Sequence, residues 1–282
     1  MDSVVVFAAN PSAFSTSETN HGVEAAARKR RFLLNIVSLD ESDMDSVKAR
    51  VRMGLSIRPA GVIVYEYDRA GIAALEYIPK DMPMVVVGGS FGDGEYQVIN
   101  AERDGGRWMT MHLLDLGHRT VFHVGRPEGP TDNTRTNGWR DALKERGVTA
   151  PDPIIVPDDD LEESVKAGRT LGRRGDVTAI FAGNDETAIA VIRGLREVGR
   201  RVPADVSVVG FDDRNFGAMW NPALTSYTQN FLDMGKRSFR MLFEQIQAKR
   251  AGDDAPPSQV EVVQGKPCLR ASERAYGDGE IA

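Results

Sequence analysis

The sequence contains a single cysteine, Cys268, among 282 residues. One cysteine cannot close an internal disulfide, and this fits a reducing compartment. Hydrophobic residues make up 41% of the chain, but no run of them approaches the roughly 20 residues that a membrane-spanning helix needs. The amino terminus, MDSVVVFAAN, lacks the basic segment and the long apolar segment of a secretory signal. We therefore expect a cytoplasmic protein.

An excess of positive charge is also missing. Lys and Arg number 35 against 41 Asp and Glu, so the net charge is −6. Such a balance gives no sign of nucleic-acid binding by the chain's own surface. The basic run Arg28–Arg31 ends an expected helix, where it complements the helix dipole.

Motifs for metal, nucleotide and nucleophilic chemistry are missing as well. The four histidines have no metal-ligand spacing with carboxylates or Cys268, and no phosphate-binding loop or dinucleotide fingerprint occurs. Residues 88–92 fit the G-x-S-x-G motif of a nucleophile elbow, but that motif requires a helix directly after the serine. Here Asp93-Gly94 and a strand-like YQVI follow. We expect neither a cofactor nor an enzyme.

Short apolar strands alternate with amphipathic helices along most of the chain, most clearly over Val177–Asp213. A strand at Val177–Ala182 precedes apolar residues at helical spacing, and a second buried strand follows at Val206–Gly210. Either Asn184 or Asp185 is a good cap for the intervening helix. Strands joined by helices pair in parallel through right-handed crossovers. The pattern predicts an α/β fold with helices on both faces of parallel sheets.

Two local features of this pattern shape the expected organisation. A polar loop rich in Ser and Thr is expected through Thr19, followed by a helix over His21–Arg31. The alternation lapses over residues 88–101, where one strand follows another with no helix between them. Two sheets are therefore expected, with a boundary near residue 100.

Several longer motifs occur in the order and spacing of one known family. They are GVEAAARKR, DGGRWMTMHLLDLGHRTVFHVG, TRTNGWRDALKERGV, TAIFAGNDETA, LREVGRRVPADVSVVGFDD and NPALTSYTQNFLDMG. Together they resemble the lactose-repressor (LacI-type) family of bacterial transcription regulators, over roughly residues 3 to 275. The resemblance implies two doubly wound parallel-sheet subdomains of the periplasmic-binding-protein type (type I), with a small-molecule effector bound in the cleft between them.

The resemblance also implies boundaries and partners. Residues 1–99 plus 231–256 would form the N-terminal subdomain, residues 100–230 plus 257–276 the C-terminal subdomain, and residues 277–282 a tail. Family members pair as homodimers. They bind operator DNA through an N-terminal helix-turn-helix head, and this sequence begins at the strand that follows such a head. A solute-binding protein of an ABC-type transporter shares the fold and is the alternative.

Three residues match effector contacts of the family: Arg135, Asn184 and Asp212. Asp212 is favoured over Asp213 because the family's contact is the first of the two. A carboxylate and a guanidinium fork suit pairs of sugar hydroxyls. The residues alone equally allow Asn184 to be only a helix cap and Arg135 to be only a solvated helix residue.

Five further residues are candidate effector contacts through the resemblance. Gln229 and Phe231 lie in the segment that crosses between subdomains, and Trp220 falls near the mouth of the cleft. Asn10 and Phe14 lie in the first strand-to-helix loop. Aromatic rings stack on the apolar faces of sugars and bases, although core packing explains each aromatic equally well.

Two positions depart from the family pattern. Asn133 stands where many relatives have a second arginine, and Gly88 stands where many have an aspartate that grips sugar hydroxyls. A sugar or a related metabolite is the expected effector class, and these departures leave its identity open.

Overall fold

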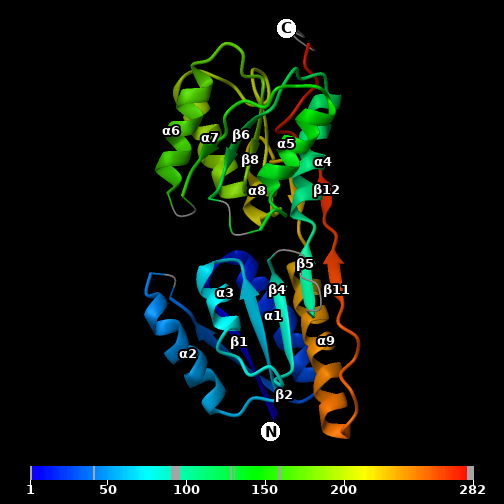
Figure 1. The fold of residues 1–282 in the computed structure, drawn as a ribbon. Coiled ribbons are helices and arrows are strands. Elements are labelled where there is room, and N and C mark those ends of the chain that lie inside the picture. Colours follow the sequence, from blue (N-terminus) through cyan, green and yellow to red (C-terminus); the bar gives the residue numbers. More distant parts are fainter. Residues whose placement is uncertain are drawn as a thin grey trace. The chain divides into compact units, whose positions relative to one another are not determined.

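The computed structural model of the chain describes residues 2–40, 42–89, 96–127, 129, 131–157 and 160–277. Two compact units are present (Figure 1). Unit 1 comprises Met1–Asn100, Gly129–Thr131 and Asn230–Gln264, and unit 2 comprises Ala101–Glu128, Asp132–Gln229 and Gly265–Ala282. Ser90 of the G-x-S-x-G motif and tail residues 278–282 lie outside the described residues. No helix in the described ranges is long and apolar enough to cross a membrane.

Unit 1 is built on one parallel sheet, in which the described strands follow the order β11-β5-β4-β3-β1-β2 (Figure 1). Its elements are β1 (Asp2–Ala8), α1 (Phe14–Lys29), β2 (Phe32–Ser38), α2 (Met44–Ser56), β3 (Gly61–Glu66), α3 (Arg69–Leu75), β4 (Met84–Gly88), β5 (Gln97–Asn100), α9 (Phe231–Ala251) and β11 (Val260–Val263). Because successive side chains of a strand point to opposite faces, β1 serves two cores. Val4 and Val6 pack with α1 and α9, whereas Val5 and Phe7 pack with α2 and α3.

Unit 2 repeats this plan with a smaller parallel sheet of order β7-β6-β8-β9 in its described part. Its elements are α4 (Glu102–Asp115), β6 (Phe122–Gly125), α5 (Arg135–Glu145), β7 (Ile154–Ile155), α6 (Leu161–Gly172), β8 (Ala179–Ala182), α7 (Asp185–Glu197), β9 (Ser207–Val209), α8 (Asn215–Met219), β10 (Ser226–Thr228) and β12 (Lys266–Cys268). Met109 of α4 and Trp139 of α5 join the core on one face, and Ala167 of α6 and Val191 of α7 join the core on the other. Strands β10 and β12 form a separate antiparallel pair.

The predicted α/β fold with parallel sheets is confirmed. The strand–helix–strand stretch that we expected to be parallel is β8–α7–β9, with Ile180 paired to Val208. Asn184 caps α7, since its Oδ1 accepts a hydrogen bond from the backbone N–H of Thr187 at 2.8 Å.

The predicted start of the first helix is wrong. Helix α1 begins at Phe14, and the residues expected to form a polar loop build its first turns. Thr19 donates from its hydroxyl to the carbonyl oxygen of Ser15 at 2.7 Å, one turn back. Bonds of this kind let Ser and Thr occupy a helix interior, although their intrinsic preference is for turns. The true turn is shorter, and Asn10 closes it by accepting from the backbone N–H of Ala13 at 3.1 Å.

The predicted third crossing, near residue 257, also requires correction. Strand β11 pairs in parallel with β5, placing Val262 beside Ile99, so the chain remains in unit 1 through Gln264. The two short elements α8 and β12, of 5 and 3 residues, were not predicted. Elements of this length contain too few residues to display a period.

Helices α4 and α5 touch backbone to backbone because glycines stand at their crossing. A Cβ on Gly138 would lie 2.0 Å from the carbonyl oxygen of Arg103, and a Cβ on Gly106 would lie 2.3 Å from that of Arg135. Gly235 plays the same part between α9 and α1, where a Cβ would lie 2.0 Å from a carbonyl oxygen of α1. Such contacts fix the spacing of each helix pair and, in unit 2, the backbone of Arg135.

Candidate functional site

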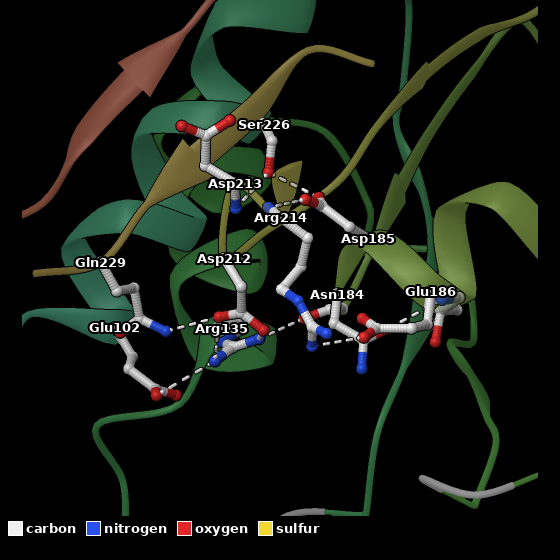
Figure 2. Close-up of polar contacts among 12 residues, drawn as sticks. Glu102, Arg135, Asn184, Asp185, Glu186, Asp212, Asp213, Arg214, Ser226 and Gln229 are labelled. Carbon is white, nitrogen blue, oxygen red and sulfur yellow. Dashed lines mark hydrogen bonds and ion pairs between the residues drawn. The ribbon is translucent and has the colours of Figure 1, made fainter. Parts of the chain in front are cut away.

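A polar cluster occupies the carboxyl-terminal edge of the unit 2 sheet, and Arg135 is at its centre (Figure 2). Its Nη2 lies 3.0 Å from Asp212 Oδ1 and 3.2 Å from Glu102 Oε1, and its Nη1 donates to the carbonyl oxygen of Gly183. The guanidinium also covers the ring of Phe211 at 4.2 Å. Burial alone would lower the pKa of Arg135, but the negative charges of Asp212 and Glu102 outweigh it and raise that pKa. Arg135 is therefore a permanent cation held in one orientation.

Two consecutive aspartates beside Arg135 have left-handed backbone conformations, with φ of 92° at Asp212 and 51° at Asp213. Such conformations cost on the order of 1–3 kcal/mol each at a non-glycine residue and persist only where the surroundings hold them. Asp212 Oδ1 accepts from Gln229 Nε2 at 2.7 Å, and Asp213 Oδ1 pairs with Arg270 Nη2 at 2.6 Å. Backbone strain of this kind gathers at functional sites.

Asp185 lies buried behind this edge. Its Oδ1 accepts from Ser226 Oγ and its Oδ2 from the backbone N–H of Arg214, both at 2.6 Å (Figure 2). Burial raises the pKa of Asp185 to about 7, against the opposing effect of these two hydrogen bonds. Asp185 ties the start of α7 to β10 and so supports Asn184, its neighbour in the chain.

The structure brings some of the predicted contacts together and places others elsewhere. Arg135, Asp212 and Gln229 are joined directly, and Asn184 follows Gly183, whose carbonyl group Arg135 contacts. Asn184 is a helix cap, and this role uses its Oδ1 and leaves its Nδ2 group outside the cap.

The four remaining candidates take no part in the contacts named above. Phe231 is 3% exposed in the unit 1 core, where it meets Phe14 edge to face with 5.8 Å between ring centroids. Asn10 is exposed at the turn before α1. Trp220 follows α8 and lines a groove described below. Their assignment as effector contacts stays a prediction from the resemblance.

Glu102 was missed by the sequence analysis. It opens α4 directly after β5, a place where a carboxylate reads as an ordinary helix-dipole partner. Asn133, which departs from the family pattern, has a structural role beside it. Ala101 at the N-cap of α4 has no side-chain acceptor, and Asn133 Oδ1 accepts from the backbone N–H of Arg103 at 3.1 Å instead.

The second departure, Gly88 in unit 1, has a backbone cause. Its φ is 84°, and a Cβ there would lie 2.4 Å from the ring of Tyr67. An aspartate in place of Gly88 would be strained and would collide with that ring. The end of β4 is therefore built for glycine.

An apolar groove lies on unit 2 between α6, α7 and α8, with a volume of about 670 Å³. Leu161, Ile189, Phe216 and Trp220 line it, and charged residues of α7 form part of its rim. Leu161 is 50% exposed and Trp220 38%, and the neighbouring Met219 is 79% exposed. We call this feature the α6–α8 groove.

Comparison with known proteins identifies the family. Residues 110–272 match the family described as a periplasmic binding protein-like domain. The chain is 30% identical over 239 residues to the HTH-type transcriptional repressor PurR of Aliivibrio salmonicida, covering 83% of this chain and 71% of that protein. It is also 30% identical over 251 residues to the HTH-type transcriptional regulator CelR of Thermobifida fusca, covering 83% of this chain and 74% of that protein.

Solved structures agree. A complex of the regulator CelR with cellobiose is 25% identical, with a TM-score of 0.81, and the match covers 96% of this chain and 84% of that chain. A dimeric lac repressor, 23% identical with a TM-score of 0.82, shares the fold over 97% of this chain and 99% of that chain. These relatives are transcription regulators, so a transporter's solute-binding protein is not favoured. The chain belongs to the LacI-type family of transcription regulators, and it forms the effector-binding core of such a regulator.

Proposed function

We propose that the polar cluster of unit 2 binds a sugar or a related metabolite, and that this binding controls DNA recognition by the regulator. The observation that carries the proposal is the joined arrangement of Arg135, Asp212 and Gln229, held by strained backbone at the edge of the sheet. Carboxyl-terminal edges of parallel sheets are where α/β proteins bind ligands.

The groups of the cluster suit hydroxyl recognition. A carboxylate accepts hydrogen bonds, a guanidinium donates them in a fixed plane, and an amide does both. Asp212, Arg135 and Asn184 supply one of each, and all three are at least partly buried, which strengthens hydrogen bonds by lowering the local dielectric constant. Relatives with cellobiose and with ribose bound, the latter a LacI family regulator from Enterococcus faecium that is 24% identical with a TM-score of 0.80 over 97% of this chain and 99% of that chain, support this effector class.

Coupling to DNA requires only that the effector bind two conformational states with different affinity. The relatives at 30% identity are named HTH-type regulators, so we propose that a helix-turn-helix domain reads the response. In this scheme residues 1–282 bind the effector, and the helix-turn-helix domain binds the DNA. A gel shift in which residues 1–282 alone bind DNA tightly and sequence-specifically would contradict this division of roles.

We also propose that a second copy of the chain covers the α6–α8 groove. The groove exposes Leu161 and Trp220, the neighbouring Met219 is also exposed, and exposed apolar patches of this kind mark interaction sites. A dimeric structural neighbour supports a second copy as the occupant. Trp220→Asp should yield monomers in sedimentation at micromolar concentration, whereas Leu269→Asp, at a residue that is 54% exposed elsewhere on unit 2, should leave dimers. Equal behaviour of the two variants would place the interface elsewhere.

A thermal-shift screen tests effector binding directly. Ribose, cellobiose, other sugars, nucleosides and phosphorylated metabolites are the probes, because a true ligand stabilises the folded state by about 2.7 kcal/mol at 100 times its Kd. Arg135→Ala should abolish the shift of any hit. Arg140→Ala, at an exposed residue of the same helix, should preserve it. A rise in melting temperature that survives Arg135→Ala unchanged would show that the polar cluster of unit 2 is not the effector site.

A further inference from the structure

Glu102 places a second carboxylate on Arg135, in addition to Asp212. Its Oε1 lies 3.2 Å from Arg135 Nη2, and its side chain is 28% exposed, against 10% for Arg135 and 11% for Asp212. Glu102 is therefore the most accessible member of this ion-pair group. The carboxylate of Glu102 is thus more open to a ligand from solvent than that of Asp212.

The position of Glu102 is fixed from two directions. Asn133 caps the first turn of α4 through the backbone N–H of Arg103, and this holds the helix end that carries Glu102. The glycine crossing of α4 and α5 sets the distance between the backbones of the two helices. The contact between Glu102 and Arg135 is thus built into the fold, unlike an ion pair between two flexible surface side chains.

Neighbouring arginine side chains are also paired with carboxylates. Arg214 pairs with Glu186 and Arg270 pairs with Asp213, each at 2.6 Å (Arg214 and Glu186 appear in Figure 2). Arg126, half-buried at the end of β6, is close enough that its charge acts on Arg135. Asp212 and Glu102 are the two described carboxylates paired with Arg135, and Arg126 adds a second positive charge nearby. Loss of the Glu102 charge therefore leaves these four residues with a net positive charge.

A buried acceptor in the cluster points to the hydrogen-bonding character of the ligand. Gln229 is 9% exposed, and its Oε1 is buried with no hydrogen-bond partner among the residues that the structure describes. Its orientation is set, because Nε2 donates to Asp212 Oδ1 and the oxygen must face the other way. A buried acceptor without a donor is costly, so a ligand that brings O–H or N–H groups completes it. Phosphate dianions and carboxylates bring acceptors only, so they could satisfy the buried Arg135 Nε, which also has no partner among the described residues, but not Gln229 Oε1. A hydroxyl group, which donates and accepts, can satisfy both.

We propose that Glu102 is a specificity-determining residue, which neutralises Arg135 so that the unit 2 cluster takes an uncharged effector with hydroxyl or N–H donors and rejects phosphorylated or carboxylate-bearing analogues. This inference rests on the proposed function, in that the cluster is the effector site. It adds the charge class of the effector and names the residue that sets it.

Glu102→Gln tests the inference, because it keeps the shape of the side chain and removes its charge. Glu145→Gln is the matched control: Glu145 pairs with Arg107 at 2.6 Å across the same two helices, on their exposed side. Melting temperatures are measured against inorganic phosphate, with chloride added to hold ionic strength constant. We expect Glu102→Gln to show saturable stabilisation at phosphate concentrations about tenfold below those that affect wild type or Glu145→Gln, because like-charge rejection has been removed. Glu102→Ala provides a second variant with the same expected direction.

Matched ligand pairs extend the test. Isothermal titration with ribose and ribose 5-phosphate, and with glucose and glucose 6-phosphate, compares neutral and anionic forms of one scaffold. Wild type should prefer the neutral member of any pair that binds, and Glu102→Gln should narrow that preference about tenfold. Wild-type binding of a sugar phosphate at least as tightly as the sugar would overturn the inference and leave the proposed function standing.

A phosphate response that is the same in Glu102→Gln, Glu102→Ala, Glu145→Gln and wild type would also overturn the role of Glu102. This measurement needs no knowledge of the effector, so it decides the inference even if none of the sugars binds. The proposed function fails on a different result, namely an effector-induced rise in melting temperature that persists in Arg135→Ala.

Discussion

The two units share one plan, and their sheets end in different chemistry. In unit 1, β4 ends at Gly88 with a left-handed backbone, beside the edge-to-face rings of Tyr65 and Tyr67. In unit 2, the corresponding edge carries Arg135 and Asp212, with a strained turn and several ion pairs. The repeated fold fixes where a ligand-facing edge lies, and the residues that follow each strand decide what that edge recognises. The ion pairs of Arg135 described above belong to the edge in unit 2.

The largest expected effect comes from Arg135→Ala. Its loss leaves Asp212 and Glu102 without their shared cation, and breaking a buried pair costs about 3 kcal/mol of unfolding free energy. Effector affinity should fall at least about 100-fold, as for hot-spot residues in general. Hydrogen–deuterium exchange should rise in unit 2 and stay at the wild-type level in unit 1.

The control for this change is Arg103→Ala. Arg103 pairs with Asp141 at 2.6 Å, but the side chains are 42% and 36% exposed, so we expect a loss below about 1 kcal/mol. Equal destabilisation by the two variants would mean that the cluster is no more than another surface ion-pair network.

The next largest effect is expected from acid, which should destabilise unit 2 through a buried histidine. His123 in unit 2 is buried, with its ring nitrogens 2.8 Å from the Phe181 carbonyl oxygen and 3.1 Å from Thr136 Oγ1, and burial lowers its pKa to about 4. Because the folded pKa lies below the unfolded value of 6.5, the unfolded state binds the proton more readily. The contribution of His123 to stability is therefore full above pH 6.5 and is lost as the pH drops toward 4, by about 3 kcal/mol. Unit 1 has no buried histidine, since its only histidine, His21, is exposed.

The measurement is the difference in unfolding free energy between wild type and His123→Gln as a function of pH. Taking a difference removes the contribution of Asp185, whose raised pKa makes stability fall as pH rises through neutrality. The difference should be constant above pH 7 and change between pH 6.5 and 4. A flat difference over this window would show that His123 is not the source of the acid response.

A matched pair of glycine substitutions should sharpen the comparison. Gly138→Ala and Gly235→Ala each drive a Cβ to 2.0 Å from a backbone carbonyl oxygen of the partner helix, and we expect about 2 kcal/mol of destabilisation in each case. Only Gly138→Ala should also weaken effector binding, because Arg135 is three residues away on α5.

Gly175→Ala is the control for both, since a Cβ there meets nothing within 4 Å. Thermal melts and titration calorimetry together separate the two effects. Equal loss of effector affinity in Gly138→Ala and Gly235→Ala would mean that the crossing in unit 1 positions effector contacts as well.

The smallest effect is expected from Asn10→Ala in unit 1. The side chain of Asn10 accepts from Ser12 Oγ at 2.9 Å and from the backbone N–H of Ala13 at 3.1 Å, so its removal should cost about 0.5–1 kcal/mol. We expect effector affinity to fall less than about tenfold, as for a peripheral hydrogen bond. A loss as large as that of Arg135→Ala would give the two units equal weight in recognition.

Local signals made most of the fold predictable. Apolar runs such as Val177–Ala182 and caps such as Asn184 act within a few residues, and the helices and strands around them follow. Helix α1 was misplaced at its start because the intrinsic preference of Ser and Thr was overridden by bonds within the helix. Strand β11 was assigned to the wrong unit because its partner, β5, lies about 160 residues earlier in the chain.

The residues of the polar cluster differ in the same way in how far the sequence pointed to them. Arg135, Asp212 and Gln229, which the structure joins, were candidates because the motifs that contain them resemble those of a family, and their role as effector contacts stays a prediction. Glu102 was not, since its contact with Arg135 spans 33 residues and appears only when α4 and α5 cross. No spacing in the sequence encodes that crossing except the glycines, and their role emerges only with the two helices in place.

If the polar cluster is the effector site, the left-handed turn at Asp212–Asp213 limits how that site can evolve. Glycine adopts such a backbone freely, asparagine and aspartate adopt it at a smaller cost than most other residues, and bulky side chains are disfavoured there. Few residue types therefore suit the position that faces Arg135. Lineages that change effector must then vary positions on regular elements, where any side chain fits the backbone. Glu102, on the first turn of a helix, is such a position, and sequence variation among relatives with different effectors should concentrate there and leave Asp212 nearly constant.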